Sequence, residues 1–184
     1  MFRKLGLLIV CLMGVLSVYA QWSISPELGL SAYRRQFYEW RPGIKVGAAV
    51  EYQFMSHFSL ESGLYYTQRG YSYTDFTDYE YVTTEEPSLV RHMFQIPLRA
   101  RFSWDVADDV RLFVGAGPYL GLFFANDWKQ TYVHRNDDYG RVAELGLSAM
   151  GGIEVRRLFV RLGCDLSFGD ERYHAETISF GYRF

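Results

Sequence analysis

Apolar and polar residues alternate one by one along most of this chain. Between residues 44 and 54, Ile44, Val46 and Val50 fall on one side of an extended chain, whereas Lys45 and Glu51 fall on the other. A period of two residues is typical of a β-strand with two unlike faces, and it does not fit a helix, whose period is 3.6 residues. The alternation therefore predicts strands.

The same pattern recurs in eight segments, at residues 22–33, 42–54, 58–70, 89–104, 109–124, 139–155, 158–168 and 174–184. These segments are longer than the ~5–6 residues of a usual globular strand. They are long enough for the ~9–11 residues that a tilted strand needs to cross a membrane. Short connections, such as 105–108 and 156–157, alternate with longer polar ones, such as 34–41, 71–88, 125–138 and 169–173. This layout is typical of an outer-membrane barrel with its short turns on the periplasmic side.

The two faces of the predicted strands differ sharply in charge. One face is almost wholly apolar, as at Leu28, Leu30, Leu145 and Leu147. The other face carries glycines together with six acids and seven bases: Glu27, Lys45, Glu51, Glu61, Arg69, Arg99, Arg101, Arg111, Glu144, Glu154, Arg161, Asp165 and Arg183. Periodicity alone does not say which face is inside. Small residues suit the crowded interior of an eight-stranded barrel, so we place the charged face in the lumen as an ion-pair network.

The pattern thus predicts an all-β fold, an eight-stranded antiparallel up-and-down transmembrane β-barrel that spans residues 21–184. A soluble barrel of the lipocalin type would have the opposite sense, with its charges outside. Side chains about fill the lumen of eight strands, whereas general-diffusion porins have ~16–18 strands. We therefore expect a plugged lumen, and a narrow pathway for small solutes stays as the alternative.

The first twenty residues have the features of a secretory signal peptide. Arg3 and Lys4 precede an apolar run from Leu5 to Leu16, and small residues around Ala20 favour cleavage after it. The run is short for a membrane-spanning helix, which needs ~20 residues. Removal of residues 1–20 would change the net charge from −2 to −4 and leave Cys164 as the only cysteine. A negative chain argues against a nucleic-acid partner.

The chain ends in alternating aromatic residues, with Phe180, Tyr182 and Phe184 on one face. This ending resembles the C-terminal signal by which the outer-membrane barrel assembly machinery selects its substrates. Three further stretches, 62–70, 95–98 and 114–121, resemble the small outer-membrane β-barrel family labelled "outer membrane protein beta-barrel domain" or porin family, akin to the OmpX and OmpA barrels. The resemblance implies an outer-membrane location and contact with outer-membrane lipid. It implies no single function, because one barrel fold serves many.

Catalytic and metal-binding patterns are weak in this sequence. None of the four histidines has a partner at metal-ligand spacing, so we expect no metal and no cofactor. A barrel enzyme that modifies lipid A would need His134 or His174 with a nearby acid, and Ser167 is the serine near the end of a strand. No nucleophilic serine stands beside either histidine. We therefore predict that the protein is not an enzyme.

The segment from residue 71 to residue 88 is acidic and rich in aromatic residues: Tyr71, Tyr73, Phe76, Tyr79 and Tyr81. Tyrosine favours interfaces because it offers a large contact area with a polar tip. The segment is either a surface for an extracellular partner or a solvated hairpin tip. The sequence favours a monomeric, non-enzymatic outer-membrane barrel that serves envelope structure or surface interaction. A narrow channel or small-ligand-binding barrel comes second, and a lipid A-modifying enzyme third.

Overall fold

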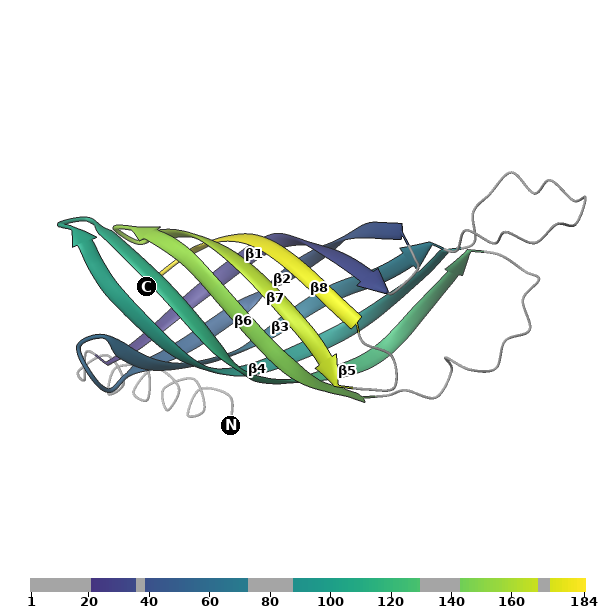
Figure 1. Cartoon of the computed structure of the whole chain (residues 1–184), viewed down its shortest axis with the longest axis horizontal. Helices are drawn as coiled ribbons and strands as arrows, with labels where there is room; N and C mark the ends of the chain where they lie inside the picture. Colours follow the sequence, from purple (N-terminus) through teal and green to yellow (C-terminus); the bar gives the residue numbers. More distant parts are fainter. Residues whose placement is uncertain (1–20, 36–38, 73–87, 130–142, 169–172) are drawn as a thin grey trace, which may run out of the picture.

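The computed structural model describes residues 21–35, 39–72, 88–129, 143–168 and 173–184, and they form an all-β structure of eight strands (Figure 1). The strands are β1 (Trp22–Arg35), β2 (Glu39–Gln53), β3 (Phe58–Ser72), β4 (Ser88–Ala107), β5 (Val110–Lys129), β6 (Ala143–Val155), β7 (Leu158–Phe168) and β8 (Tyr173–Tyr182). In this described part of the chain, no helix is long and apolar enough to cross a membrane. The predicted strand content is confirmed.

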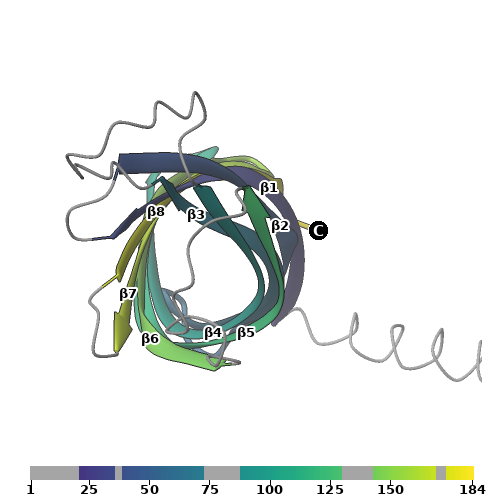
Figure 2. The same cartoon turned by 90° about the vertical axis from the view of Figure 1, so that its right-hand side faces the viewer.

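The strands close into a barrel. Each strand pairs antiparallel with its neighbour in the chain, and β1 also pairs with β8, from Glu27 opposite Gly181 to Arg35 opposite Tyr173. Viewed along the barrel, the eight strands form a continuous ring (Figure 2). Closure removes the sheet edges, so every strand has a hydrogen-bonding partner on both sides. This confirms the predicted eight-stranded up-and-down topology.

The strand ends differ from the predicted boundaries in an informative way. β4 continues to Ala107, so the predicted turn at 105–108 is wrong and the turn is only Asp108 and Asp109. β5 continues to Lys129, into the predicted loop 125–138, where Asn126 pairs with Arg91. Backbone pairing needs no apolar side chain, so these polar strand ends leave no alternation in the sequence. The strand predicted from residue 139 starts at Ala143, and residues 139–142 lie outside the described part.

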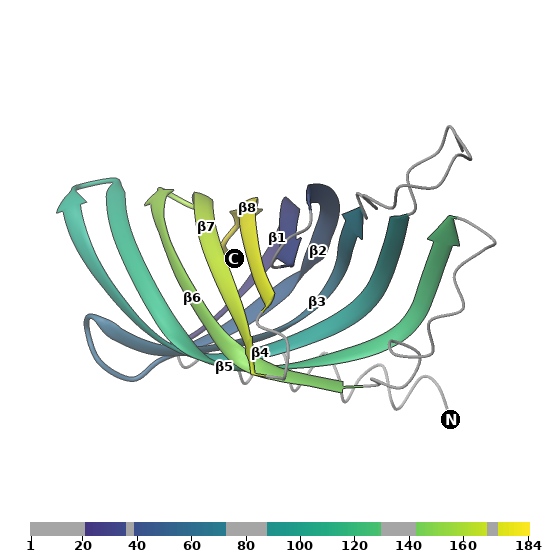
Figure 3. The same ribbon diagram turned by 45° about the vertical axis from the view of Figure 1, so that its right-hand side comes forward.

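Short turns gather at one end of the barrel and the longer connections start from the other. The turns between β4 and β5 and between β6 and β7 lie at the same end as the C-terminus, as Figures 1 and 3 show. We call this the turn end and the opposite end the loop end. Because β4 and β5 are 20 residues long and β8 only 10, the β4–β5 pair extends farther at the loop end.

Apolar side chains cover the outside and polar ones fill the inside. Leu30, Leu145 and Leu162 are each about 60% exposed on the exterior, whereas Glu61 and Arg161 are 1% exposed. Along β6, exposed and buried residues alternate over its first eight positions. The predicted sense of the two faces is confirmed, because a soluble barrel would bury the leucines and expose the charges.

Four aromatic side chains in the lumen each lie against a glycine on the neighbouring strand. In each case the register pairs the two residues directly: Tyr65 with Gly47, Tyr119 with Gly146, Phe113 with Gly152 and Phe159 with Gly181. A Cβ atom added to any of these glycines would collide with the paired ring. The glycines therefore let the rings lie against the barrel wall and fill the lumen at close packing.

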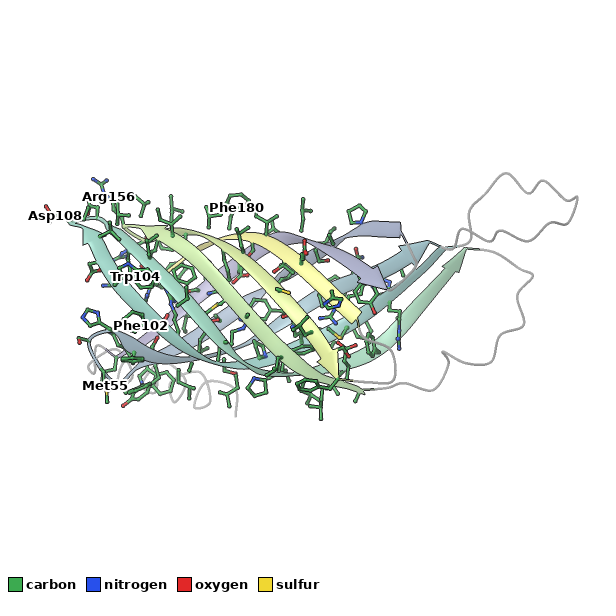
Figure 4. All side chains as sticks on the ribbon, in the orientation of Figure 1. Met55, Phe102, Trp104, Asp108, Arg156 and Phe180 are labelled. Atoms are coloured by element: carbon green, nitrogen blue, oxygen red, sulfur yellow. The ribbon has the colours of Figure 1, made fainter. Side chains whose placement is uncertain are left out.

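Two aromatic groups flank the apolar exterior. At the turn end, the ring of Phe102 lies 4.9 Å from that of Phe58 and 5.6 Å from that of Trp104, measured between centroids (Figure 4). Toward the loop end, Phe94 stacks on Phe124 at 4.7 Å. Aromatic residues at both margins of an apolar band are the arrangement expected at the two interfaces of a membrane.

Adding one methyl group at Gly152 should destabilise the barrel, because its Cβ atom would overlap the Phe113 ring. We expect Gly152→Ala to lower the free energy of unfolding by about 1–3 kcal/mol, measured by urea unfolding in lipid vesicles. Gly151→Ala is the matched control, since its Cβ atom would meet its nearest neighbours at an ordinary 3.7 Å. Equal effects of the two variants would contradict the packing described here.

Candidate functional site

The lumen holds a network of six carboxylates and six cations that are joined by ion pairs among the described residues. The members are Glu27, Lys45, Glu51, Glu61, Arg69, Arg99, Arg101, Glu144, Glu154, Arg161, Asp165 and Arg183. These are the predicted lumenal charges apart from Arg111. They lie in three tiers along the barrel, which we call the turn-side, central and loop-side tiers.

The central tier is built around Glu61 on β3. Glu61 Oε1 accepts from Arg99 Nη1 on β4 at 3.0 Å, and its Oε2 accepts from Arg161 Nη2 on β7 at 2.7 Å. Arg161 also reaches Glu27 Oε2 on β1 at 2.9 Å, and Glu27 pairs with Lys45 Nζ on β2 at 3.2 Å. This tier therefore connects five strands across the lumen.

The turn-side tier is a closed ring of four charges. Arg101 on β4 contacts Glu51 at 2.5 Å and Glu154 at 3.3 Å. Arg183, which follows β8, contacts the same two carboxylates at 3.1 and 3.2 Å. Arg101 Nη1 also lies 3.7 Å from Glu61 Oε2, so this ring is joined to the central tier.

The loop-side tier centres on Arg69 of β3. Its guanidinium pairs with Glu144 on β6 at 2.5 Å and with Asp165 on β7 at 3.2 Å. Gln95 donates to Asp165 at 2.8 Å, and the Tyr119 hydroxyl donates to Glu144 at 2.5 Å. Each neutral donor bonds to the same carboxylate oxygen that Arg69 contacts, Glu144 Oε1 or Asp165 Oδ2, so both buried acids have a second donor.

An apolar layer lies beside the central and turn-side tiers. Phe113, Met150 and Phe159 form a buried cluster in the lumen. The Arg101 guanidinium lies 4.1 Å from the Phe113 ring centroid, and that of Arg161 lies 5.2 Å from the Phe159 centroid. These cation–π contacts let aromatic rings share the lumen with charged groups.

Arg111 forms its ion pair at the turn end, outside the three tiers. Its side chain is one-third exposed, and its Nε donates to Asp105 at 2.8 Å at the turn end. Asp105 lies past Trp104, beyond the apolar band, and the hydrogen bond from Arg111 lowers the pKa of its carboxyl group. The ion pair of Arg111 is thus with the acid of its own hairpin, although the register also places Arg111 directly opposite the lumenal Glu154.

Sequence reasoning missed several lumenal residues. Arg91 is buried, with its guanidinium 3.8 Å from the Phe123 ring centroid. Arg91 and Gln95, like Arg99 and Arg101, have odd residue numbers on β4 and therefore face the same side of the strand. The alternation could thus have identified them as lumenal residues. Tyr119 was harder to place, because the sequence does not say whether a tyrosine faces lipid or fills a lumen.

The other predicted site residues are the C-terminal aromatic residues and the residues of the segment 71–88. Phe180 is exposed on the exterior (Figure 4), and the rings of Tyr182 and Phe184 are 4.8 Å apart. Tyr71 lies in β3 opposite Leu89. The described part does not include the signal segment 1–20 or the loop positions Tyr73, Phe76, Tyr79 and Tyr81.

The histidines and the strand-end serine do not form a catalytic group where the structure describes them. Ser167 is buried on the lumenal side, whereas His174 is exposed on the exterior. The Nδ1 atom of His57 lies 3.0 Å from the Ser103 carbonyl oxygen. Within the described ranges, no group of histidines, cysteines and acids could hold a metal ion.

Comparison with known families identifies the barrel. The family model described as "Outer membrane protein beta-barrel domain" matches residues 18–172, which is most of the chain. The chain belongs to this family. Membership places it in the outer membrane of a bacterium, with the apolar exterior toward lipid.

Solved structures of outer-membrane barrels are similar to this chain. OprG from Pseudomonas aeruginosa has a TM-score of 0.55 and 10% identity, with 89% of this chain and 96% of OprG covered. Neisserial surface protein A has a TM-score of 0.53 and 13% identity, with 88% and 95% covered. Ail of Yersinia pestis has a TM-score of 0.49 and 15% identity, with 89% and 98% covered. OprG and Neisserial surface protein A show the shared fold. The comparison with curated proteins gave no match.

Neutralising Glu61 should destabilise the barrel, because it would leave Arg99 and Arg161 with excess positive charge in the lumen. We expect Glu61→Gln to lower the free energy of unfolding by about 3–5 kcal/mol. Asp109→Asn is the control, since Asp109 pairs with Arg156 at an exposed turn, and we expect a change of at most about 1 kcal/mol. For each variant, the midpoint temperature of the heat-induced gel-mobility change is compared with that of the wild type. An unchanged midpoint for Glu61→Gln would show that the network does not stabilise the barrel.

Proposed function

We propose that this chain is a non-enzymatic outer-membrane barrel with a plugged lumen, which serves envelope structure or surface interaction through its extracellular loops. The observation that carries the proposal is the central tier, where Arg161 on β7 reaches both Glu27 on β1 and Glu61 on β3. Side chains that meet across the barrel occupy the path that a solute would take. An eight-stranded lumen is narrow enough for them to do so.

The turn-side and loop-side tiers also place paired charges across the lumen, which supports the proposal of a plugged barrel. The turn-side ring joins Arg101 to both Glu51 and Glu154, so it closes the lumen a second time. The loop-side tier joins Arg69 to Glu144 and Asp165. Moving an ion through these tiers would require separating charges that have little water around them, which costs free energy.

A conductance measurement in planar lipid bilayers tests the plug. We expect no steady single-channel current from the wild type, and brief openings from Arg161→Ser, because that variant loses both contacts across the lumen. Arg156→Ser is the control, since Arg156 is exposed at the turn end (Figure 4). Steady current from the wild type would contradict the plug and favour the narrow channel.

The segment 71–88 is the part of the chain that we assign to surface interaction. Its tyrosines have the chemistry of an interface residue, and its flanking strands run to Ser72 on β3 and from Ser88 on β4 at the loop end. The short turns lie at the opposite end, which in this family of folds is periplasmic. The segment would therefore face the exterior of the cell.

Deletion of residues 72–86 should abolish surface attachment without unfolding the barrel. We expect expressing cells to attach to a solid surface no better than cells without the protein, while the boiled and unboiled protein still differ in gel mobility. A length-matched variant with serine at Tyr73, Tyr79 and Tyr81 should have the same effect. If attachment persists in both variants, the interaction role of this segment is wrong.

The proposal also assigns an export signal and an assembly signal to the two ends of the chain. Residues 1–20 direct secretion, and the exterior face that ends in Phe180, Tyr182 and Phe184 serves as the signal for the barrel assembly machinery. The exposure of Phe180 and Phe184, 59% and 71%, supports this role because a recognition signal must be accessible. The barrel is a monomer in contact with outer-membrane lipid and takes no nucleic acid as partner.

A further inference from the structure

The two-residue turn between β6 and β7 holds an arginine in a strained backbone conformation. Arg156 has a φ of 59°, in the left-handed region, and no other non-glycine residue of the described part has a positive φ. Glycine, asparagine or aspartate is usual at such a turn position, because a larger side chain is crowded there. An arginine in this place suggests that the position is kept for the chemistry of its side chain.

Asp109 of the neighbouring turn holds Arg156 in this conformation. The Arg156 backbone N–H donates to the Asp109 carbonyl oxygen at 2.8 Å, and Arg156 Nε donates to the Asp109 carboxylate at 3.2 Å. The N–H groups of the two Nη atoms have no acceptor among the described residues, and the side chain is 78% exposed. These N–H groups are therefore available to a second acceptor.

Arg157 supplies a second guanidinium group beside the first. Its side chain is exposed, and none of the acidic side chains that the structure describes forms an ion pair with it. Its carbonyl oxygen accepts from the backbone N–H of Arg183 at 2.8 Å, which fixes the turn to the residue after β8. Two adjacent guanidinium groups on a fixed backbone suit a phosphate group, whose oxygens match their planar pairs of N–H donors.

The turn lies where the apolar exterior ends. Val155 and Leu158, on either side of the two arginines, pair with each other and are 46% and 65% exposed. Trp104 of the turn-end aromatic group lies at the level of Ile153, since both pair with Leu112. The arginines therefore lie just beyond the aromatic residues at the membrane interface, at the depth of the phosphate groups of the periplasmic leaflet.

One acid beside the turn is also without an ion pair. Asp108 precedes Asp109, is exposed, and pairs with no basic side chain in the described ranges. Figure 4 shows Asp108 and Arg156 at the same end of the barrel. Asp105 and Asp109 already pair with arginines, so Arg157 and Asp108 are left as one positive and one negative charge. Such a pair matches a zwitterionic headgroup better than an anionic one.

We propose that this turn binds one phospholipid with a phosphoethanolamine headgroup. The Nη groups of Arg156 and Arg157 donate to the phosphate. The ammonium group donates to the Asp108 carboxylate, and the acyl chains lie along Val155 and Leu158. A soluble phosphate ester would lack the contact with these apolar residues. A phosphatidylglycerol headgroup would offer the phosphate alone and leave the carboxylate without a counter-charge.

Native mass spectrometry of the full chain, folded in a non-ionic detergent, tests this site with three lipids of equal chain length. The probes are didecanoyl phosphatidylethanolamine, didecanoyl phosphatidylglycerol and didecanoylglycerol. We expect phosphatidylethanolamine to bind about tenfold more tightly than didecanoylglycerol, because charged hydrogen bonds are added to the same chain contact. Phosphatidylglycerol should bind with intermediate strength, and Asp108→Asn should remove the difference between the two phospholipids. Glycerophosphoethanolamine, which has no chains, should bind more weakly than the matching lipid, and equal binding would contradict a lipid site.

Arg156→Gly separates lipid binding from the shape of the turn. Glycine adopts the left-handed conformation freely, so this variant should not lower the midpoint temperature of the heat-induced gel-mobility change. It should nevertheless reduce the binding of both phospholipids to the level of didecanoylglycerol, and Arg157→Gln should reduce it as well. Glu176→Gln is the matched control for Asp108→Asn, because it removes an exposed acid of β8 near the loop end.

The gel shift verifies that each variant is folded, and this test is independent of conductance and attachment. Equal binding of phosphatidylethanolamine and either other lipid to the wild type would overturn the proposal. Wild-type phospholipid binding by Arg156→Gly would overturn it too, because the arginine would then serve only the turn.

Discussion

The pairing of charges inside a narrow lumen is the constraint on which the rest of this structure depends. Eight strands leave too little room to hydrate six carboxylates and six cations, so each must find partners on other strands. Arg161 and Arg101 do this by crossing to acids on strands that are not their neighbours. The ion pairs therefore tie opposite walls together and, in the same geometry, occupy the lumen.

The glycines and the exterior follow from that interior. Long arginine side chains and aromatic rings fit together only because Gly152 and Gly146 leave space for Phe113 and Tyr119. With polar groups facing inward, the alternation turns leucine and isoleucine outward, where a membrane covers them.

Much of the fold could be predicted because lipid on one side and charge on the other impose a strict period of two. The bounds of β7 and the lumenal positions of residues such as Glu61 and Arg99 followed from that alone. Beyond the apolar band, strands pair through their backbones and no longer alternate, so the turn-end extension of β4 and the loop-end extension of β5 were missed. The period gives the side of a residue but not its depth, so the sequence could not show that Arg111 pairs with Asp105 at the turn end. The sequence also could not show that Ala32 and Glu176 lie directly opposite each other, which depends on the register of β1 and β8.

The most direct measurement places a small fluorescent label at two adjacent positions of β6, Leu147 and Ser148, in Cys164→Ala protein reconstituted with brominated lipids. Leu147 is 44% exposed on the exterior, whereas Ser148 is 1% exposed and accepts hydrogen bonds from Arg99. We expect the lipids to quench the label at position 147 and to leave the label at position 148 nearly unquenched. Equal quenching, or quenching only at position 148, would contradict a barrel with its charges inside.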